Sequence, residues 1–213
     1  MTAFSAVNIR SLGLTEYSET FEEMKHFTKL RTSDTVDEIW FTEHRPVFTQ
    51  GIAGRKEHIL VPGEIPIIHS DRGGQVTYHG PGQVMGYLLF DLRRKKVSVR
   101  ELVFKIEQSI ICTLRELAID GERLIGAPGI YVDSKKIASL GLRVSRGCSY
   151  HGLSLNVNMD LEPFQRINPC GLKNLGVTQV SDQVSLQVDQ SKELLLKAII
   201  DEFGFSPPDK LGS

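Results

Sequence analysis

The sequence predicts an α/β protein of the α+β type, in which helices pack on one mixed, largely antiparallel sheet. Strand-like patterns outnumber helical ones, and the three long helical segments lie at the start, in the middle and near the end of the chain. The strand patterns between residues 126 and 157 follow one another through short turns, which is typical of antiparallel pairing. At 213 residues, a single domain over 1–213 is expected, with a loose tail over 206–213.

The first helix is predicted to begin at Thr15, whose hydroxyl can cap it, and to bury a face that carries Tyr17 and Phe21. Strands are expected on both sides of this helix. Pro46 interrupts the strand pattern around it, because proline cannot donate to a sheet ladder. The strand patterns of this half occupy residues 5–9, 38–44, 47–49, 65–69 and 84–91.

The second half contains a predicted hairpin between two helices. Ser98 and Glu101 form a capping box for a helix that buries apolar side chains as far as Leu117. Asp133 and Ser134 are expected to form the turn of the hairpin. Its strands cover residues 129–132 and 136–144, a further strand covers 149–157, and the last helix covers 187–203.

Composition and charge exclude several classes of protein. The net charge is -1, whereas nucleic-acid binders are usually strongly basic. No apolar run is long enough to cross a membrane, and no signal peptide is recognisable. The three cysteines leave one unpaired in any pairing. We therefore expect a cytoplasmic protein with reduced thiols that binds neither nucleic acid nor membrane.

No cofactor or metal site is indicated by the motifs. Neither G-x-x-x-x-G-K-[ST] nor G-x-G-x-x-G occurs, so both common nucleotide-binding loops are absent. Cys148 and His151 have a C-x-x-H spacing, but a second pair of ligands at zinc-site spacing is missing. We expect a protein that uses no cofactor and no metal.

Lys136 occupies an unusual position in its predicted strand. Successive residues alternate between the two faces of a strand, so Lys136 shares a face with Ala138 and Leu140. That face is apolar, and burial disfavours the ammonium form of a lysine. The neighbouring Lys135 points to the opposite face. Of the two lysines, Lys136 is the unusual one.

Cys170 lies in the short sequence Asn168-Pro169-Cys170-Gly171. Proline fixes one backbone angle and glycine permits conformations closed to other residues, so such a turn holds the cysteine side chain at a defined angle. Two interpretations remain open from the residues alone. The thiol is either a small buried apolar group or a nucleophile, and as a nucleophile it could belong to a Cys-His hydrolase with His79 or His151 as its base.

A glycine-rich stretch over residues 72–83 is predicted to contact a ligand. It holds four glycines among polar side chains, and glycine commonly lets the backbone approach another molecule closely. A flexible hairpin turn is the alternative. A basic run follows at residues 93–96. It is either a solvated face or, with Arg143 and Arg146, a docking surface for an acidic partner protein.

Five ordered motifs, spread over nearly the whole chain, resemble those of the bacterial octanoyltransferase family, the lipoyl(octanoyl) transferases. They read RGGQVTYHGPGQ at 72–83, GAPGIYV at 126–132, KIASLG at 136–141, RGCSYHG at 146–152 and NPCG at 168–171. The resemblance implies the α/β fold of the biotin and lipoate protein ligase catalytic domains. It also implies transfer of an octanoyl group from octanoyl-acyl carrier protein to a lysine of lipoyl domains, in 2-oxoacid dehydrogenase E2 subunits and the glycine cleavage H protein.

The same resemblance implies roles for individual residues. Cys170 is expected to be the nucleophile that carries the acyl group as a thioester, and Lys136 its general base. The residues expected to bind the acyl substrate are Arg72, Gly73, Gly74, Gln75, Val76, Thr77, Tyr78, His79, Ser139, Leu140, Gly141, Gly152, Leu153 and Ser154. An ATP-dependent lipoate or biotin ligase and a catalytically silent acyl-binding module remain alternatives. A ligase needs no cysteine nucleophile, so the two candidate catalytic residues favour transfer.

Overall fold

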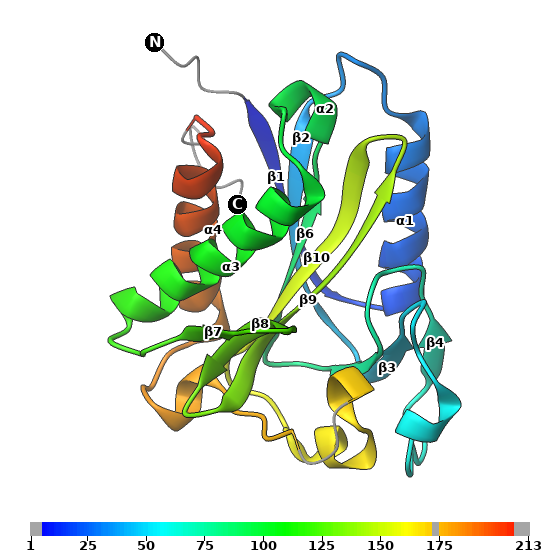
Figure 1. Ribbon diagram of the computed structural model, residues 1–213, viewed down its shortest axis with the longest axis vertical. Helices are drawn as coiled ribbons and strands as arrows, with labels where there is room; N and C mark the ends of the chain where they lie inside the picture. Colours follow the sequence, from blue (N-terminus) through cyan, green and yellow to red (C-terminus); the bar gives the residue numbers. More distant parts are fainter. Residues whose placement is uncertain (1–5, 172–174, 207–213) are drawn as a thin grey trace.

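The computed structural model of the chain describes residues 6–171 and 175–206. Its centre is a mixed sheet of seven strands with helices on both faces, and a second sheet of three strands lies near one end of it (Figure 1). Across the large sheet the strands follow in the order β1 (Val7–Thr15), β2 (Asp37–His44), β6 (Gln83–Leu89), β10 (Cys148–Asn156), β9 (Lys135–Ser145), β8 (Ala127–Val132) and β7 (Glu122–Leu124).

The small sheet contradicts the prediction of a single sheet. It consists of β4 (Ile67–His69), β3 (Val47–Gln50) and β5 (Val76–His79), in that order. The chain leaves the large sheet at the Arg45-Pro46 break, and β3 then pairs with β5, a strand inside the glycine-rich stretch. Among the described strands, β1 with β2 and β3 with β4 pair in parallel and the remaining named pairs are antiparallel. The predicted largely antiparallel arrangement is therefore confirmed.

Helices cover both faces of the large sheet. α3 (Val99–Glu116) and α4 (Val188–Phe203) pack over the main apolar cluster on one face. α1 (Tyr17–Leu30) packs on the other face, over a second cluster around Trp40. These three helices match the predicted helical segments. No helix in the described part of the chain is long and apolar enough to cross a membrane.

Short helical pieces complete the chain. The turn α2 (Leu92–Lys95) falls on the basic run and is not predicted by the sequence. The 3₁₀ turns are η1 (Lys56–His58), η2 (Glu162–Arg166), η3 (Pro169–Gly171) and η4 (Val180–Asp182). Of the tail expected over 206–213, residues 207–213 lie outside the described residues.

The start of α1 differs from the prediction. Its N-cap residue is Glu16, which makes no side-chain cap bond. Thr15 instead ends β1, where its hydroxyl lies 2.9 Å from that of Thr42 and 3.1 Å from Nδ1 of His44. β1 is longer than predicted because it pairs with β2 as far as Thr15. Residue 5 of the predicted strand lies outside the described residues.

The pairing of β8 with β9 shifts by one residue beside Lys136. Ala138 lies opposite Ile130, but Lys136 lies opposite Tyr131. An extra residue in one strand breaks the strict alternation of its faces. As a result Ile137 is fully buried in the main apolar cluster, although alternation alone predicts that it faces away from Lys136 and its apolar neighbours.

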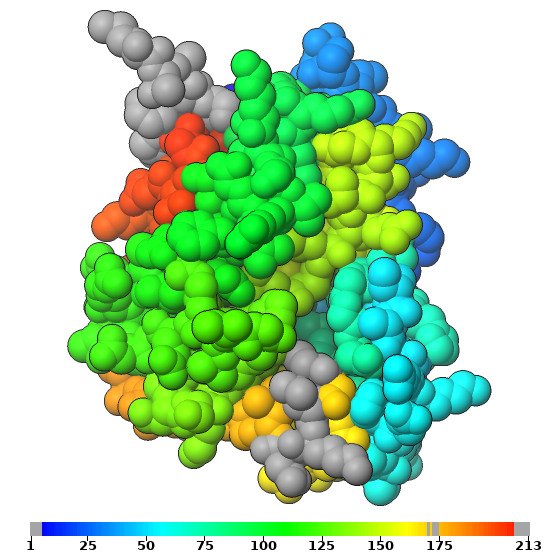
Figure 2. Space-filling view, in the orientation of Figure 1, coloured from blue at the N-terminus to red at the C-terminus, as the bar shows by residue number. Residues whose placement is uncertain are grey.

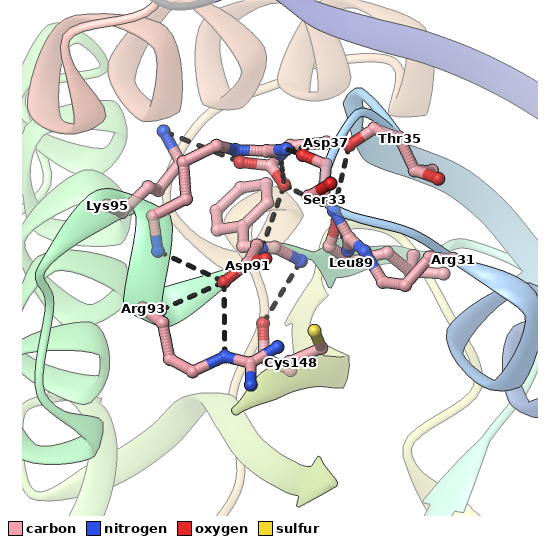
Figure 3. Close-up of polar contacts among 12 residues, drawn as sticks. Arg31, Ser33, Thr35, Asp37, Leu89, Asp91, Arg93, Lys95 and Cys148 are labelled. Atoms are coloured by element: carbon pink, nitrogen blue, oxygen red, sulfur yellow. Dashed lines mark hydrogen bonds and ion pairs between the residues drawn. The ribbon is translucent and has the colours of Figure 1, made fainter. Parts of the chain in front are cut away.

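A buried cluster of charges surrounds Asp37 near α2 (Figure 3). Oδ1 of Asp37 accepts hydrogen bonds from Nη2 of Arg31 at 2.7 Å and from Nη2 of Arg94 at 2.6 Å. Nζ of Lys95 lies 3.7 Å from Oδ2 of the same carboxylate. The backbone N–H of Asp91 adds a further bond of 2.8 Å. One carboxylate thus holds three cations from two distant parts of the chain.

This cluster corrects the prediction for the basic run 93–96. The side chain of Lys95 is 8% exposed, and its ammonium lies 3.6 Å from the ring centroid of Phe205. Arg94 also donates to the backbone oxygens of Ser33 and Thr35. The solvated-face interpretation is therefore wrong for Lys95, whereas the side chain of Arg94 is 38% exposed and is bonded to Asp37 from the surface.

Candidate active site

A cavity lies where β5 meets β6, β9 and β10, with an empty volume of about 480 Å³ that includes space open to solvent. We call it the enclosed cavity, because it is less open than the second cavity described below. Three stretches that are far apart in the sequence meet there: the glycine-rich stretch, the middle of β9 and the middle of β10. Residues of the predicted substrate-binding set that line it are Arg72, Gly74, Gln75, Val76, Thr77, His79, Ser139, Leu140, Gly141, Gly152, Leu153 and Ser154.

Two members of the predicted set lie elsewhere. The ring of Tyr78 packs in a separate apolar cluster, with its centroid 5.6 Å from that of Phe48 and 5.5 Å from that of Phe164. The strand alternation of β5 explains this direction. Gly73 borders a neighbouring cavity instead, and its N–H donates to the backbone oxygen of Leu142 at 2.8 Å.

Tyr17, Met85 and Tyr87 also line the enclosed cavity, although no motif singles them out in the sequence. Both tyrosine hydroxyls are hydrogen-bonded, that of Tyr17 to Oγ of Ser70 at 2.7 Å and that of Tyr87 to Nε2 of His44 at 2.5 Å. Burial raises the pKa of both tyrosines. The phenols therefore stay neutral at physiological pH and present mainly their rings to the cavity.

Arg72 ties the glycine-rich stretch to the small sheet. Its Nη2 donates to the backbone oxygen of Thr49 at 2.6 Å and to that of Gln75 at 2.9 Å, and its Nη1 donates to the oxygen of Gly73 at 2.8 Å. The residue is 8% exposed. A buried guanidinium that binds several carbonyls fixes the backbone around it. Arg72 therefore sets the shape of the cavity wall.

Two buried histidines near the cavity are neutral at physiological pH. Nδ1 of His79 lies 2.8 Å from Oε1 of Gln83, and Nε2 lies 3.1 Å from Oγ1 of Thr49. Burial lowers the pKa of His79 to about 3, and the charges of His44 and Arg72 add to the shift. Burial also lowers the pKa of His44 to about 4. With both ring nitrogens engaged and so low a pKa, His79 is a poor general base for a cysteine.

His151 lines the cavity and is paired with a carboxylate. Its Nε2 lies 2.8 Å from Oδ1 of Asp71, and the hydroxyl of Tyr150 donates to the same carboxylate. Burial lowers the pKa of His151, although Asp71 opposes the shift. Burial raises the pKa of Asp71, but the bonds from His151 and Tyr150 outweigh it and the net shift is downward. Nδ1 of His151 is buried and has no hydrogen-bond partner among the described residues.

Lys136 lines a second cavity, which we call the lysine cavity and whose empty volume of about 1030 Å³ includes space open to solvent. Figure 2 shows a hollow in this part of the surface, between the green surface of α3, β8 and β9 and the cyan surface of the segment before β4. Lys136 is 4% exposed, and its ammonium lies 5.3 Å from the ring centroid of Tyr131. Lys135 is exposed. The predicted contrast in burial between the two lysines is confirmed.

Cys170, the predicted nucleophile, belongs to η3. Its side chain and residues 172–174 lie outside the described residues. The N–H of Asn168 donates to the backbone oxygen of His58 at 2.8 Å, and that of Gly171 to the oxygen of Asn168 at 3.0 Å. A Cβ on Gly171 would lie 3.3 Å from Cγ of Gln75. η3 therefore packs against a residue that lines both cavities.

The two cavities share a wall. Gly74, Gln75, Leu140 and Gly141 line both of them. A Cβ on Gly141 would lie 2.9 Å from Cδ of Arg72, so this part of the wall requires glycine. The arrangement can hold an apolar chain in the enclosed cavity with its reactive end directed past the shared wall towards the lysine cavity and η3.

The partial zinc motif of the sequence has its two side chains in separate contacts. Sγ of Cys148 lies 3.9 Å from the backbone oxygen of Arg146, whereas His151 is bonded to Asp71. Within residues 6–171 and 175–206, no group of three or more His, Cys, Asp or Glu side chains is placed to hold a metal ion.

Comparison with known sequences gives matches over most of the chain. A family model described as the lipoyl protein ligase A/B catalytic domain matches residues 16–200. The octanoyltransferase of Marinobacter nauticus is 56% identical over 199 residues, which is 93% of this chain and 94% of that protein. The octanoyltransferase of Cellvibrio japonicus is 56% identical over 182 residues, which is 85% of each.

Solved structures with the same fold are lipoate and biotin ligases. A putative lipoate protein ligase from T. acidophilum superposes with a TM-score of 0.79 at 15% identity, over 96% of this chain and 88% of that one. A lipoate-protein ligase A bound with ATP superposes with a TM-score of 0.74 at 13% identity, over 98% of this chain and 89% of that one. A biotin protein ligase from Aquifex aeolicus superposes with a TM-score of 0.54 at 12% identity, over 93% of this chain and 69% of that one. The predicted fold of the biotin and lipoate protein ligase catalytic domains is confirmed.

Proposed function

Because this chain belongs to the octanoyltransferase family, we propose that it moves an octanoyl group from octanoyl-acyl carrier protein, through a thioester on Cys170, to a lysine of a lipoyl domain. Octanoyl transfer in lipoate biosynthesis is the activity that its relatives support. The proposed acceptors are the lipoyl domains of 2-oxoacid dehydrogenase E2 subunits and the glycine cleavage H protein, and the proposed compartment is the cytoplasm.

The observation that carries the proposal is the position of Lys136. It is a buried lysine beside an apolar cavity, and the turn that holds Cys170 packs on the shared wall through Gln75. An amine held at one place beside the turn of the proposed nucleophile suits a general base. The enclosed cavity on the other side of the wall is lined by Leu153, Met85 and aromatic rings. Such a lining suits an eight-carbon acyl chain.

The first half of the proposed reaction forms the acyl-enzyme. The neutral amine of Lys136 takes the thiol proton of Cys170, and the thiolate attacks the thioester carbonyl of the donor. The new C–S bond to Cys170 forms as the C–S bond to the carrier breaks. The carrier thiolate leaves with the proton that Lys136 holds, so the lysine is neutral again.

The second half transfers the acyl group to the acceptor. Lys136 takes a proton from the acceptor amine, which attacks the Cys170 thioester and forms an amide C–N bond. The C–S bond to Cys170 breaks, and the thiolate recovers its proton from Lys136. Donor and acceptor therefore react in turn at one base and one nucleophile, and neither ATP nor a metal is needed.

His151 supports the one competing reaction that the site itself favours. A cysteine with a histidine base and an orienting carboxylate is a common hydrolase arrangement, and the bond between His151 and Asp71 supplies the last two parts. Under that alternative the acyl-enzyme is hydrolysed without an acceptor. His151→Gln would then abolish turnover, whereas transfer through Lys136 predicts that acyl-enzyme still forms in this variant.

The decisive experiment is intact-mass spectrometry after incubation with octanoyl-acyl carrier protein in the absence of ATP. We expect a single octanoyl adduct that hydroxylamine removes, that is absent from Cys170→Ser and that disappears when apo lipoyl domain is added. Labelling that requires Mg-ATP and free octanoate would support the ligase alternative. Normal turnover by Cys170→Ser would refute the proposal.

Adjacent lysines provide a matched pair of variants. Lys136→Arg keeps the charge but removes a usable base, since guanidinium does not deprotonate near neutral pH. We expect acyl-enzyme formation to slow by about 10² to 10⁴, the usual range for loss of a general base. Lys135→Arg changes an exposed side chain, so its rate of acyl-enzyme formation should stay close to that of the unmodified protein. Rapid acylation by Lys136→Arg in quenched-flow measurements would show that Lys136 is not the base.

A further inference from the structure

Glu107 is a buried carboxylate on α3 that faces the strand β8. It is 7% exposed. One oxygen, Oε1, accepts a hydrogen bond from the backbone N–H of Gly129 at 3.1 Å. The other oxygen, Oε2, accepts one from Nε of Arg123 at 3.0 Å. Glu107 therefore links the backbone of β8 to an arginine of β7 through two hydrogen bonds.

The end of the Lys136 side chain packs against the backbone of Gly129. A Cβ built on Gly129 would lie 2.7 Å from Cε and 3.2 Å from Nζ of Lys136. The φ of Gly129 is 127°, a backbone conformation that residues with a Cβ rarely adopt. The missing side chain thus leaves the space that the end of Lys136 occupies, and the position of this backbone limits where the amine can be.

The backbone of Lys136 is held independently of Glu107. Its N–H donates to the oxygen of Gly176 at 2.8 Å, and its oxygen accepts from the N–H of Thr178 at 3.0 Å. On the other side it pairs with Tyr131, whose ring also contacts the ammonium. The start of the side chain is therefore fixed by strands, whereas its end rests on Gly129. A shift of Gly129 would move the amine without moving the strand.

We propose that Glu107 is a positioning residue for Lys136, which acts through the backbone of Gly129. The proposal rests on the proposed function in one respect, namely that Lys136 is the base. Glu107 holds the N–H of Gly129, Gly129 supports Cε and Nζ of Lys136, and the amine is thereby kept at one place in the lysine cavity. A sequence pattern cannot show this, because Glu107 reads as an ordinary polar residue of an amphipathic helix.

Arg123 explains how a carboxylate can serve here. A buried carboxylate without a partner is costly, and here it would place an uncompensated negative charge next to Gly129. Arg123 neutralises that charge, and it is itself held by the backbone oxygen of Phe104 and by Oε1 of Gln108, each at 3.1 Å. Its guanidinium carbon also lies 4.4 Å from the ring centroid of Phe104. Glu107 keeps its acceptor oxygens without exposing Lys136 to a net charge.

The test uses two substitutions of Glu107, measured by single-turnover acylation with a small octanoyl thioester. Glu107→Gln retains an acceptor for Gly129 and should acylate within about threefold of the unmodified rate. Glu107→Ala loses the acceptor and should acylate about 10- to 100-fold more slowly with an unchanged half-saturating donor concentration. Equal rates for Glu107→Ala and the unmodified protein would overturn the proposal.

Arg123→Gln separates positioning from a general weakening of the fold. It removes the bond that orients Oε2 of Glu107, so acylation per folded molecule should slow by about threefold or more while the half-saturating donor concentration stays unchanged. A general weakening of the fold would instead lower the amount of folded protein and leave the rate per folded molecule as it is. If Glu107→Ala fails to fold, Arg123→Gln decides alone, and an unmodified rate per folded molecule overturns the proposal.

Lys105→Ala is the matched structural control. Lys105 also leaves α3 to make an ion pair, with Oε1 of Glu202 at 3.4 Å, but it faces α4 and not β8. Lys105→Ala should lower stability slightly and leave the acylation rate per folded molecule unchanged. Failure of the proposed function would appear separately, as normal acylation by Lys136→Arg. A slow Lys136→Arg together with a fast Glu107→Ala would refute only the role of Glu107.

Discussion

The cluster around Asp37 and the wall of the enclosed cavity both bury arginine, but they use it in opposite ways. Around Asp37, two arginines and a lysine converge on one carboxylate, and little space is left between them. Around Arg72, the guanidinium is held by backbone oxygens and the hydroxyl of Thr49, and the residues beside it enclose empty space.

The difference shows how the same residue types serve a scaffold and a site. Buried opposite charges in contact lock distant segments together, and removing one partner leaves uncompensated charge. A cavity for an apolar chain must avoid such charge, and here burial keeps His44 and His79 neutral. Around Asp37 opposite charges therefore contact one another, whereas the guanidinium in the cavity wall is held by backbone oxygens and a hydroxyl. Four experiments test this contrast.

Asp37→Ala should produce the largest loss of stability. Its carboxylate is 2% exposed, and its removal leaves Arg31, Arg94 and Lys95 without it. We expect the free energy of unfolding to fall by about 3–5 kcal/mol, measured by urea denaturation. Glu22→Ala removes an exposed partner of Lys25 and should cost less than about 1 kcal/mol. Similar losses in the two variants would contradict the contrast.

Acidification should produce the second-largest loss of stability, through two histidines near the enclosed cavity. Folding lowers the pKa of His44 from 6.5 to about 4 and that of His79 from 6.5 to about 3. Both histidines therefore bind protons more readily in the unfolded chain. Their contribution is complete above pH 6.5 and is lost as the pH falls towards the folded-state values, by on the order of 3 kcal/mol for each. Unfolding free energies measured from pH 7 to pH 4 should show this slope.

Substitution of a single histidine checks the source of that slope. His79→Gln removes one titrating group and should flatten the pH dependence. His26→Gln replaces an exposed histidine of α1 and should leave the slope as it is. A slope that is the same in all three proteins would show that the cavity histidines do not titrate on unfolding.

Filling the enclosed cavity should change substrate preference more than stability. Ser154 is 4% exposed and lines this cavity, so Ser154→Leu puts three carbon atoms into the proposed acyl site. We expect kcat/KM for an octanoyl thioester to fall about 10-fold or more, in the range of one or two methylenes in an apolar pocket. A hexanoyl thioester serves as the internal control and should lose less. An equal fall in kcat/KM for the two donors would show that the acyl chain does not bind in the enclosed cavity.

The smallest effect is expected at the outer part of the basic run. Arg93 and Lys96 are exposed, unlike Lys95, so their charges remain available to an acidic carrier protein. The double substitution Arg93→Ala, Lys96→Ala should raise KM for octanoyl-acyl carrier protein about threefold at low salt, because rim charges mainly affect association. KM for a small octanoyl thioester should not change. An equal change for both donors would remove the docking role.

Features that depend on neighbouring residues could be predicted from the sequence. The burial of Lys136 is predicted from its apolar neighbours in the strand, although the shift in pairing beside it breaks the alternation of faces. The start of α3 follows from Ser98, whose Oγ accepts the N–H of Glu101 at 3.2 Å. The gathering of residues from the glycine-rich stretch, β9 and β10 around one cavity follows from the family resemblance. Their roles in binding stay predictions until the acylation experiments are made.

Features that depend on distant partners could not be predicted. Arg94 and Asp37 are 57 positions apart, so nothing near the basic run indicates that Arg94 and Lys95 contact a distant carboxylate. The small sheet depends on the pairing of β3 with β5, and the glycines around β5 conceal a strand of only four residues. Tyr17, Met85 and Tyr87 have the pattern of ordinary core positions, and only the folded chain brings them to the cavity.

The shared wall has a consequence for how this enzyme family can diversify. At Gly141 any side chain would meet Arg72, and Gly74 has a φ of 87° that disfavours other residues, so these two positions of the shared wall cannot change gradually. The depth of the enclosed cavity is instead set by ordinary side chains such as Met85, which can be exchanged one at a time. If the enclosed cavity holds the acyl chain as proposed, descendants of this sequence can acquire a preference for a new acyl length without changing the shared wall.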